Sequence, residues 1–133
     1  MADYFKLIDI PKIEDARGNL AVIEKEIIPF EIKRVYYLYD VPSTAYRGGH
    51  AHQAQHSIMI ALSGSFDVLL ENSKYKEAIT LNKPDKGLLI PAGTWREIDN
   101  FSSGAVCLVI SSGEFDESDY IRDYQTFKSL FKF

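Results

Sequence analysis

The sequence has one cysteine, three histidines and no long apolar run, and each scarcity excludes a class of protein. Cys107 cannot form a disulfide within the chain, and its place in the apolar run AVCLVI is typical of a buried, unreactive thiol. No apolar run approaches the roughly 20 residues that a membrane helix needs. The first residues, MADYFKLIDI, lack the basic start and apolar centre of a signal peptide. We therefore expect no membrane insertion and a cytoplasmic location.

Positive charge is also scarce, because 15 Lys and Arg residues stand against 19 Asp and Glu residues, giving a net charge of -4. A protein that binds nucleic acid by neutralising many phosphates needs the opposite balance, so we expect no nucleic-acid partner. A small anionic ligand held by a few arginines remains compatible with this charge. The length of 133 residues predicts a single domain over residues 1–133, with one core.

Short runs of β-branched and aromatic residues, separated by turn residues, make up most of the chain. This spacing favours an all-β fold, a compact antiparallel jelly-roll barrel that can hold one ligand inside. The predicted strands lie within residues 20–27, 34–41, 56–71 (two strands broken at SGS), 76–81, 87–92, 96–101 and 105–112.

The segment 116–131 has a different pattern. Tyr120, Tyr124, Phe127 and Phe131 recur at steps of three and four, which predicts one short C-terminal helix docked on a sheet. Asp116 or Ser118 could cap its start, and core packing is the expected role of its aromatic residues.

All three histidines fall in the stretch RGGHAHQAQH, at positions 50, 52 and 56. In one unbroken strand these positions would share a face, so a three-histidine metal site is one interpretation. Gly48 and Gly49 indicate a turn or a close backbone approach just before them. Proton transfer by two of the histidines is the other interpretation.

The spacing of the histidines resembles the first motif of the cupin superfamily, in which H-x-H is followed four residues later by a glutamate ligand; His56 stands at that position here. The second cupin motif, P-x-G-x-x-H-x-x-x-N, resembles PAGTWREIDN at 91–100, with Arg96 in place of the last histidine ligand. A guanidinium has no lone pair to donate and repels a divalent cation. We therefore expect a cupin without a metal.

A metal-free site with two histidines, arginines and tyrosines suits proton abstraction next to a carbonyl, since donors nearby can stabilise the enolate oxygen. In RVYYLYD, Tyr37 and Tyr39 share one face while Tyr36 and Leu38 take the other, and one of these faces should line the barrel interior. Arg17, Arg47 and Arg96 stand near glycine or aromatic turn positions from which a side chain can reach a pocket rim.

Nearly the whole chain resembles the WxcM-like cupin family of sugar 3,4-ketoisomerases, which act on dTDP-4-dehydro-6-deoxyglucose. The resemblance implies an isomerase, free of metal and cofactor, that moves the keto group from C4 to C3 through an enediol(ate). Its product would be transaminated to a 3-amino-3,6-dideoxy sugar for surface polysaccharides. The matching stretches are 15–24, 29–41, 47–52, 62–70, 81–112 and 115–127.

The resemblance also implies roles for individual residues. His50 would carry the proton between the two carbons, His52 would hydrogen-bond or move a hydroxyl proton, and Tyr37 would lie near the same oxygens. The substrate-binding residues would be Arg17 and Arg47 at the pyrophosphate or sugar oxygens, with Trp95 and Arg96 closing the pocket. The family forms homodimers that exchange N-terminal strands, so we expect a homodimer of this kind.

The sequence departs from the family pattern at two positions, and it is also compatible with three other functions. Gln53 replaces a common lysine and His56 replaces a common glutamine, which could alter rate or substrate preference. A sugar-nucleotide epimerase, a metal-dependent cupin oxygenase using all three histidines, and a non-catalytic sugar-binding module are the alternatives. The sequence fixes neither the configuration at C4 of the product nor the nucleotide base.

Overall fold

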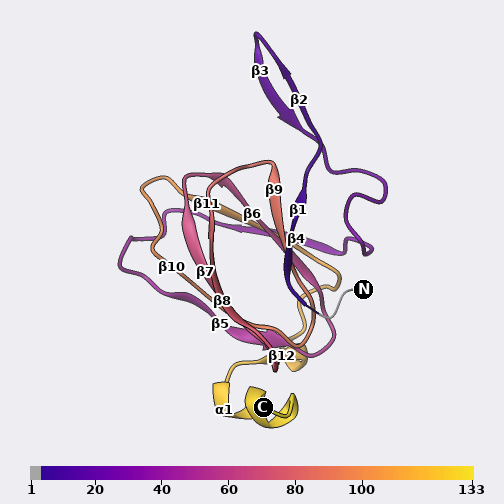
Figure 1. Ribbon diagram of the computed structural model, residues 1–133, viewed down its shortest axis with the longest axis vertical. Coiled ribbons are helices and arrows are strands. Elements are labelled where there is room, and N and C mark those ends of the chain that lie inside the picture. The colour runs from indigo at the N-terminus through magenta and orange to yellow at the C-terminus, as the bar shows by residue number, and fades with distance from the viewer. Residues whose placement is uncertain (1–3) are drawn as a thin grey trace.

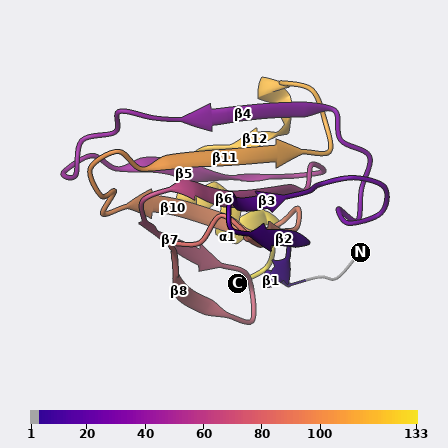
Figure 2. The same ribbon diagram turned by 90° about the horizontal axis from the view of Figure 1, so that it is seen from above.

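The computed structural model describes residues 4–133, so residues 1–3 of the predicted domain lie outside the described part. Two five-stranded antiparallel sheets face each other (Figures 1 and 2). This architecture confirms the prediction of an all-β jelly-roll barrel. The first sheet has the order β1 (Lys6–Asp9), β9 (Lys86–Ile90), β6 (Ser57–Ser63), β11 (Val106–Ser111), β4 (Arg34–Leu38). The second has the order β12 (Tyr120–Ile121), β5 (Arg47–His52), β10 (Trp95–Asp99), β7 (Phe66–Glu71), β8 (Lys76–Leu81).

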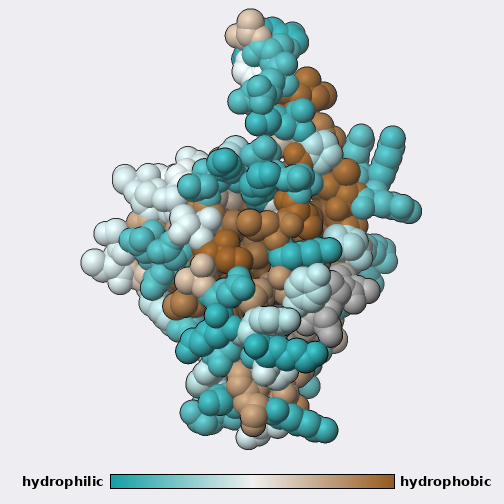
Figure 3. All heavy atoms as spheres, in the orientation of Figure 1, coloured by the Kyte–Doolittle hydropathy of each residue, from teal (hydrophilic) through white to brown (hydrophobic). Residues whose placement is uncertain are grey.

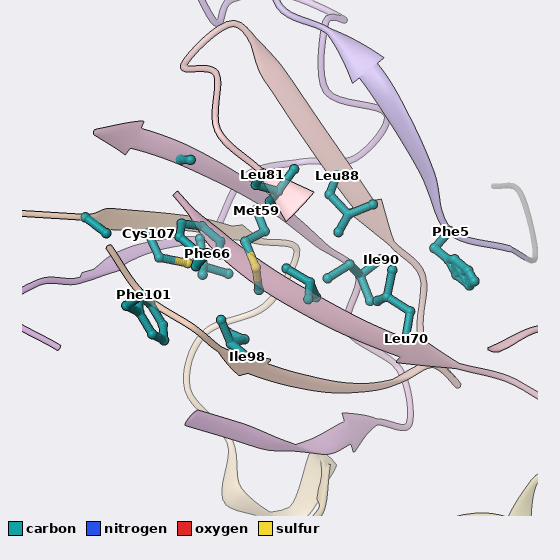
Figure 4. Packing of buried hydrophobic residues seen from close by; sticks show 14 residues of the cluster. Phe5, Met59, Phe66, Leu70, Leu81, Leu88, Ile90, Ile98, Phe101 and Cys107 are labelled. Carbon is teal, nitrogen blue, oxygen red and sulfur yellow. The ribbon is translucent and has the colours of Figure 1, made fainter. Parts of the chain in front are cut away.

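The main core fills the space between the two sheets because apolar residues alternate along the strands. In β7, Phe66, Val68 and Leu70 point inward and are buried, while the residues between them are partly exposed. The inward residues of β6, β9, β10 and β11 join them in one cluster (Figure 4). The core does not fill one end of the barrel, where polar side chains gather and form a pocket.

A loop covers the outer face of the first sheet. Ile23, Ile27, Ile28 and Phe30 pack there against apolar side chains of β6, β9 and β11. The predicted strand at 20–27 is therefore wrong beyond Ala21, where β3 (Gly18–Ala21) ends. The apolar residues that suggested a strand are used instead to cover a sheet face from a loop.

The strands β2 (Lys12–Asp15) and β3 form a hairpin of their own, paired with each other and with no other strand of residues 4–133. Every residue of the two strands is exposed. The hairpin projects from the barrel as a separate arm (Figure 1).

The predicted helix over 116–131 is shorter than expected. Asp116 caps only a 3-10 turn, η1 (Glu117–Asp119), and β12 follows directly because its backbone pairs with β5. The helix α1 (Tyr124–Leu130) begins after Asp123, whose side chain accepts a hydrogen bond from the Thr126 amide. Among the helices of residues 4–133, none has the length and apolar character to cross a membrane.

Packing between the sheets predicts a large cost for removing a central side chain. Leu88 is fully buried in β9, so Leu88→Ala should lower the free energy of unfolding by about 2–5 kcal/mol. The matched change Leu130→Ala, at a side chain that is 53% exposed in α1, should cost less than about 1 kcal/mol. Urea denaturation of both variants measures this difference, and equal costs would contradict the placement of the core.

Candidate active site

A pocket of about 410 Å³ opens between the two sheets. Polar and aromatic side chains reach it from β4, β5, β10 and β12, while Met59 of β6 and Val109 of β11 contribute apolar surface. Within the described residues the lining contains no aspartate or glutamate. The lining residues are Tyr36, Leu38, Tyr46, Arg47, Gly48, His50, Met59, Arg96, Ile98, Val109, Tyr120 and Arg122.

His50 and His52 lie on the same side of β5, with ring centroids 5.1 Å apart. The backbone of β5 is irregular just before them, since the register against β10 shifts between Arg96 and Glu97. Gly48 and Gly49 take φ values of +85° and +68°, and a Cβ on Gly49 would lie 2.9 Å from the Tyr46 hydroxyl. The glycines therefore permit a bulge that directs the His50 ring into the pocket.

Both histidines are held in their neutral, proton-accepting form. Burial lowers the pKa of His50 to about 2, and the charges of Arg96 and His52 add to this. Burial likewise lowers the pKa of His52, with a further contribution from Arg96. The Nε2 atoms of both rings are buried without a hydrogen-bond partner among residues 4–133. His50 lines the pocket, so its Nε2 can meet a ligand there, and His52 holds a second unpartnered nitrogen next to it.

Arg96 supplies a buried positive charge at the centre of the site. Its side chain is 1% exposed, and its Nε and Nη2 atoms have no hydrogen-bond partner within the described chain. Burial lowers the pKa of this guanidinium. An unpaired buried cation is costly, so the site is arranged to receive oxygen atoms or negative charge from a ligand.

Tyrosines and further arginines complete the pocket. Tyr120 packs against the rings of His50 and His52, at centroid distances of 4.9 and 4.4 Å. The guanidinium of Arg122 lies 4.3 Å from the Tyr120 ring centroid and forms an ion pair with Glu117. Burial raises the pKa of Tyr36, which keeps its phenol protonated as a hydrogen-bond donor.

A carboxylate stands behind the histidine pair. Oδ2 of Asp119 lies 3.0 Å from Nδ1 of His52, and both side chains are buried. The same carboxylate accepts hydrogen bonds from the backbone amides of Ala54 and Gln55. The turn after β5 is therefore tied to the segment before β12.

Of the seven predicted site residues, the structure brings four together: His50, His52, Arg47 and Arg96. His50, Arg47 and Arg96 line the pocket, and His52 contacts His50 from behind it. The other three lie elsewhere in the chain.

Tyr37 and Trp95 lie outside the pocket of a single chain. Side chains alternate along β4, so Tyr36 enters the pocket and Tyr37 is 60% exposed on the opposite face. Trp95 is buried beneath α1 against Phe127 and donates through Nε1 to Glu97. Neither reaches the pocket within one chain.

Arg17 also lies outside the pocket of its own chain. It stands between the two strands of the projecting hairpin, where it pairs with Asp15, and its side chain is 90% exposed. It is absent from the lining of its own pocket. Within one chain, Arg17 therefore does not take part in the pocket that His50 and Arg96 line.

The sequence interpretation missed Tyr36, Asp119, Tyr120 and Arg122. The alternation in RVYYLYD offered Tyr36 as one of two choices. Asp119, Tyr120 and Arg122 lie in the segment 116–131, for which the spacing of the aromatic residues predicted a helix. The only sign of a strand there is the pair Tyr120 and Ile121, two residues that favour β structure.

The interpretation as a three-histidine metal site fails on geometry. Strand β5 ends at His52, so His56 lies beyond a turn, where its Nδ1 accepts a hydrogen bond from the Ala92 amide. Its ring packs near Phe30 rather than near the other two histidines. In residues 4–133, no group of three or more His, Cys, Asp or Glu side chains is arranged to hold a metal ion.

Known proteins resemble this chain over nearly its whole length. The family model described as "FdtA: WxcM-like, C-terminal" matches residues 3–132. A curated relative, the TDP-4-oxo-6-deoxy-alpha-D-glucose-3,4-oxoisomerase of Aneurinibacillus thermoaerophilus, is 43% identical over 124 residues, which are 92% of this chain and 89% of the relative.

Solved structures extend the comparison. QdtA, a sugar 3,4-ketoisomerase from Thermoanaerobacterium thermosaccharolyticum crystallised with TDP, matches with a TM-score of 0.94 and 41% identity, over 99% of this chain and 97% of that one. A histidine-to-asparagine variant of QdtA was crystallised with TDP-4-keto-6-deoxyglucose. An epimerase of Mycobacterium tuberculosis shares the fold alone, with a TM-score of 0.75 and 13% identity over 89% of this chain and 68% of that one. By sequence over nearly its whole length, and by its fold, this chain belongs to the WxcM-like FdtA family of sugar 3,4-ketoisomerases.

Proposed function

We propose that this chain is a 3,4-ketoisomerase that converts dTDP-4-dehydro-6-deoxyglucose to its 3-keto isomer without a metal or other cofactor. The observation that carries the proposal is a ligand-sized pocket lined by the neutral His50 and by the buried guanidinium of Arg96, which has no ion-pair partner among residues 4–133, with the neutral His52 next to His50. The relatives' activities supply the substrate class.

The first step is removal of the C3 proton. Nε2 of His50 takes the proton, and the electron pair of the C–H bond forms a C3–C4 double bond while the C4 carbonyl oxygen becomes an enolate. Arg96 stabilises the negative charge on that oxygen, because a preorganised cation in a water-poor pocket lowers the barrier. Tyr36 and Tyr120 are further donors within the same lining.

The second step returns the proton at the neighbouring carbon. The C3 hydroxyl proton moves to the C4 oxygen with the help of His52, and His50 then delivers its proton to C4 as the C3 carbonyl forms. Substrate and product have the same composition, so no oxidant or reductant is needed. Neutral histidines can accept and return protons in this way, whereas histidines that were already charged could not begin the reaction.

The anionic part of the substrate would bind at the mouth of the pocket. Arg47 and Arg122 line it, and guanidinium groups match the oxygens of a pyrophosphate. Binding of this dianion would also compensate the buried charge of Arg96.

We place the enzyme in the cytoplasm, where the single thiol Cys107 stays reduced. Its product would be consumed by a transaminase that makes a 3-amino-3,6-dideoxy sugar for surface polysaccharides. The configuration at C4 of the product follows from the face of the ring that receives the proton.

We further propose a homodimer in which the β2–β3 hairpin packs on a second copy. Ile13 and Leu20 of the hairpin are 62% and 55% exposed, and an isolated two-stranded hairpin is at best marginally stable in water. Apolar residues also gather at the hairpin's base and on the face below it (Figure 3). In such a dimer Arg17 could reach the partner's pocket, which would reconcile its predicted role with its position.

The reaction itself is tested by incubating the protein with dTDP-4-dehydro-6-deoxyglucose in deuterated water. Carbon NMR should show a carbonyl at C3 of the product, and proton NMR should show deuterium replacing hydrogen at C3 or C4. His50→Asn should lower kcat by at least about 100-fold, since general acid–base catalysis contributes that much. The matched control His56→Asn lies outside the pocket and should retain activity. Inverted ring carbons with the ketone still at C4 would identify an epimerase instead.

The pH dependence follows from the lowered pKa of His50. A base with a folded-state pKa of about 2 is neutral at all higher pH values, and activity is lost only as the pH falls toward that pKa. The value of kcat/KM should therefore stay within about twofold from pH 8 to pH 5. An ordinary histidine with a pKa near 6.5 would instead cause a fall of about 30-fold at pH 5. Circular dichroism at each pH checks that the protein is folded.

The dimer is tested by charged substitutions on the hairpin. The double variant Ile13→Asp, Leu20→Asp should sediment as a monomer and unfold at a lower temperature, because it places carboxylates in the proposed contact. Leu130→Asp changes a side chain with the same degree of exposure in α1 and should leave the oligomer intact. Monomeric wild-type protein at micromolar concentration in analytical ultracentrifugation would refute the proposal.

A further inference from the structure

The contact between Asp119 and His52 assigns a function to a residue that the proposed mechanism leaves unused. Asp119 is 8% exposed, its carboxylate accepts hydrogen bonds from the backbone amides of Ala54 and Gln55, and its Oδ2 lies 3.0 Å from Nδ1 of His52. Its partner ring is fully buried. A carboxylate flanked by two amide donors is an acceptor only, so Nδ1 of His52 must carry the ring proton.

That constraint determines what the other ring nitrogen can do. With the proton on Nδ1, the Nε2 atom of His52 keeps its lone pair. This atom is buried and has no hydrogen-bond partner within residues 4–133. A buried acceptor without a donor costs free energy until a ligand supplies one, and a sugar hydroxyl is a donor of the right kind.

The two histidines differ in what lies behind them. His50 has a backbone hydrogen bond at Gly48, whereas His52 has a negative charge 3.0 Å away. A nearby carboxylate stabilises an imidazolium more than a neutral backbone group does. His52 is thereby suited to accept a hydroxyl proton for a short time and to return it.

We propose that Asp119 is the positioning residue of the site: it holds His52 as the Nδ1–H tautomer and supports its charge while the hydroxyl proton of a substrate that reaches past His50 passes through Nε2. The part concerning the substrate rests on the proposed isomerase function. The part concerning the tautomer rests only on the contacts of the free protein.

Asp119 directly precedes the strand that pairs with the strand of His52. It ends η1 directly before β12, whose Tyr120 pairs with His52 across the two strands. The pairing of β12 with β5 and the contact of the Asp119 carboxylate with Nδ1 therefore both position the imidazole of His52. The charged and titratable groups around His52 are Asp119, His50, Tyr120, Arg96, Arg34 and Arg122.

The experiment reads the tautomer of His52 in protein labelled with 15N at histidine, without substrate. The chain has three histidines, so His50→Asn and His56→Asn assign the His52 signals by elimination. The wild-type spectrum should show a protonated Nδ1 and an unprotonated Nε2 for His52. A protonated Nε2 in the wild type would overturn the proposal before any variant is made.

The variant Asp119→Asn removes the charge while keeping an amide oxygen for the Ala54 N–H. It should shift His52 toward the Nε2–H tautomer and lower kcat at least about 10-fold, with KM changed less than about threefold. The control Asp116→Asn alters a carboxylate of the same segment that caps η1 and does not contact His52, and it should leave both readouts unchanged.

The outcomes separate the two proposals. A lower melting temperature for Asp119→Asn, with the tautomer and kcat unchanged, would mean that Asp119 only ties the turn to η1. If the wild type shows the predicted tautomer but no ketone migration, the isomerase proposal fails and the assignment of the tautomer stands. If Asp119→Asn does not fold, the wild-type spectrum alone still decides the tautomer.

Discussion

The buried guanidinium of Arg96 is the constraint on which the chemistry of the site depends. It is almost fully buried, and two of its nitrogens have no hydrogen-bond partner among residues 4–133. Its charge helps to keep both histidines neutral and therefore ready to accept a proton. The same charge disfavours a divalent cation at the pocket and favours an anionic intermediate. Arg96, at a position where the cupin motif has a histidine ligand, thus favours acid–base catalysis over metal binding in this barrel.

The barrel can hold this unfavourable charge because the strands around it are well supported. Arg96 lies in β10, which is paired on one side with β5 and on the other with β7. The alternating core residues of β7 anchor that pair, while the bulge at Gly48 and Gly49 gives β5 the local freedom to aim His50. The apolar layer between the sheets stabilises the fold. The polar end of the barrel can therefore contain buried polar groups without hydrogen-bond partners, which lower stability.

The sequence predicted the fold class and the centre of the site for identifiable physical reasons. Alternating apolar residues and turn residues predicted most strands. His50 and His52 are two positions apart, which in a strand predicts side chains on the same face. Prediction failed where tertiary contacts outweighed local pattern. The isoleucines after Ala21 cover a sheet face from a loop, and parity alone could not decide which face of β4 points inward, so Tyr37 was chosen over Tyr36. No local signal marks Arg17 as belonging to an arm that leaves the barrel.

The segment from Glu117 to Arg122 shows why the site could not be completed from sequence. Its helical spacing of aromatic residues is real, but the backbone of Tyr120 and Ile121 instead completes the edge of the second sheet beside β5. This pairing brings Asp119, Tyr120 and Arg122 to the histidines, whereas a continuous helix over 116–131 would not make that pairing. Asp119 ends η1 and places its carboxylate against Nδ1 of His52, while Tyr120, the first residue of β12, packs its ring against the same imidazole. A long-range backbone pairing that leaves little trace in the local sequence therefore positions Asp119, Tyr120 and Arg122 around the reacting centre.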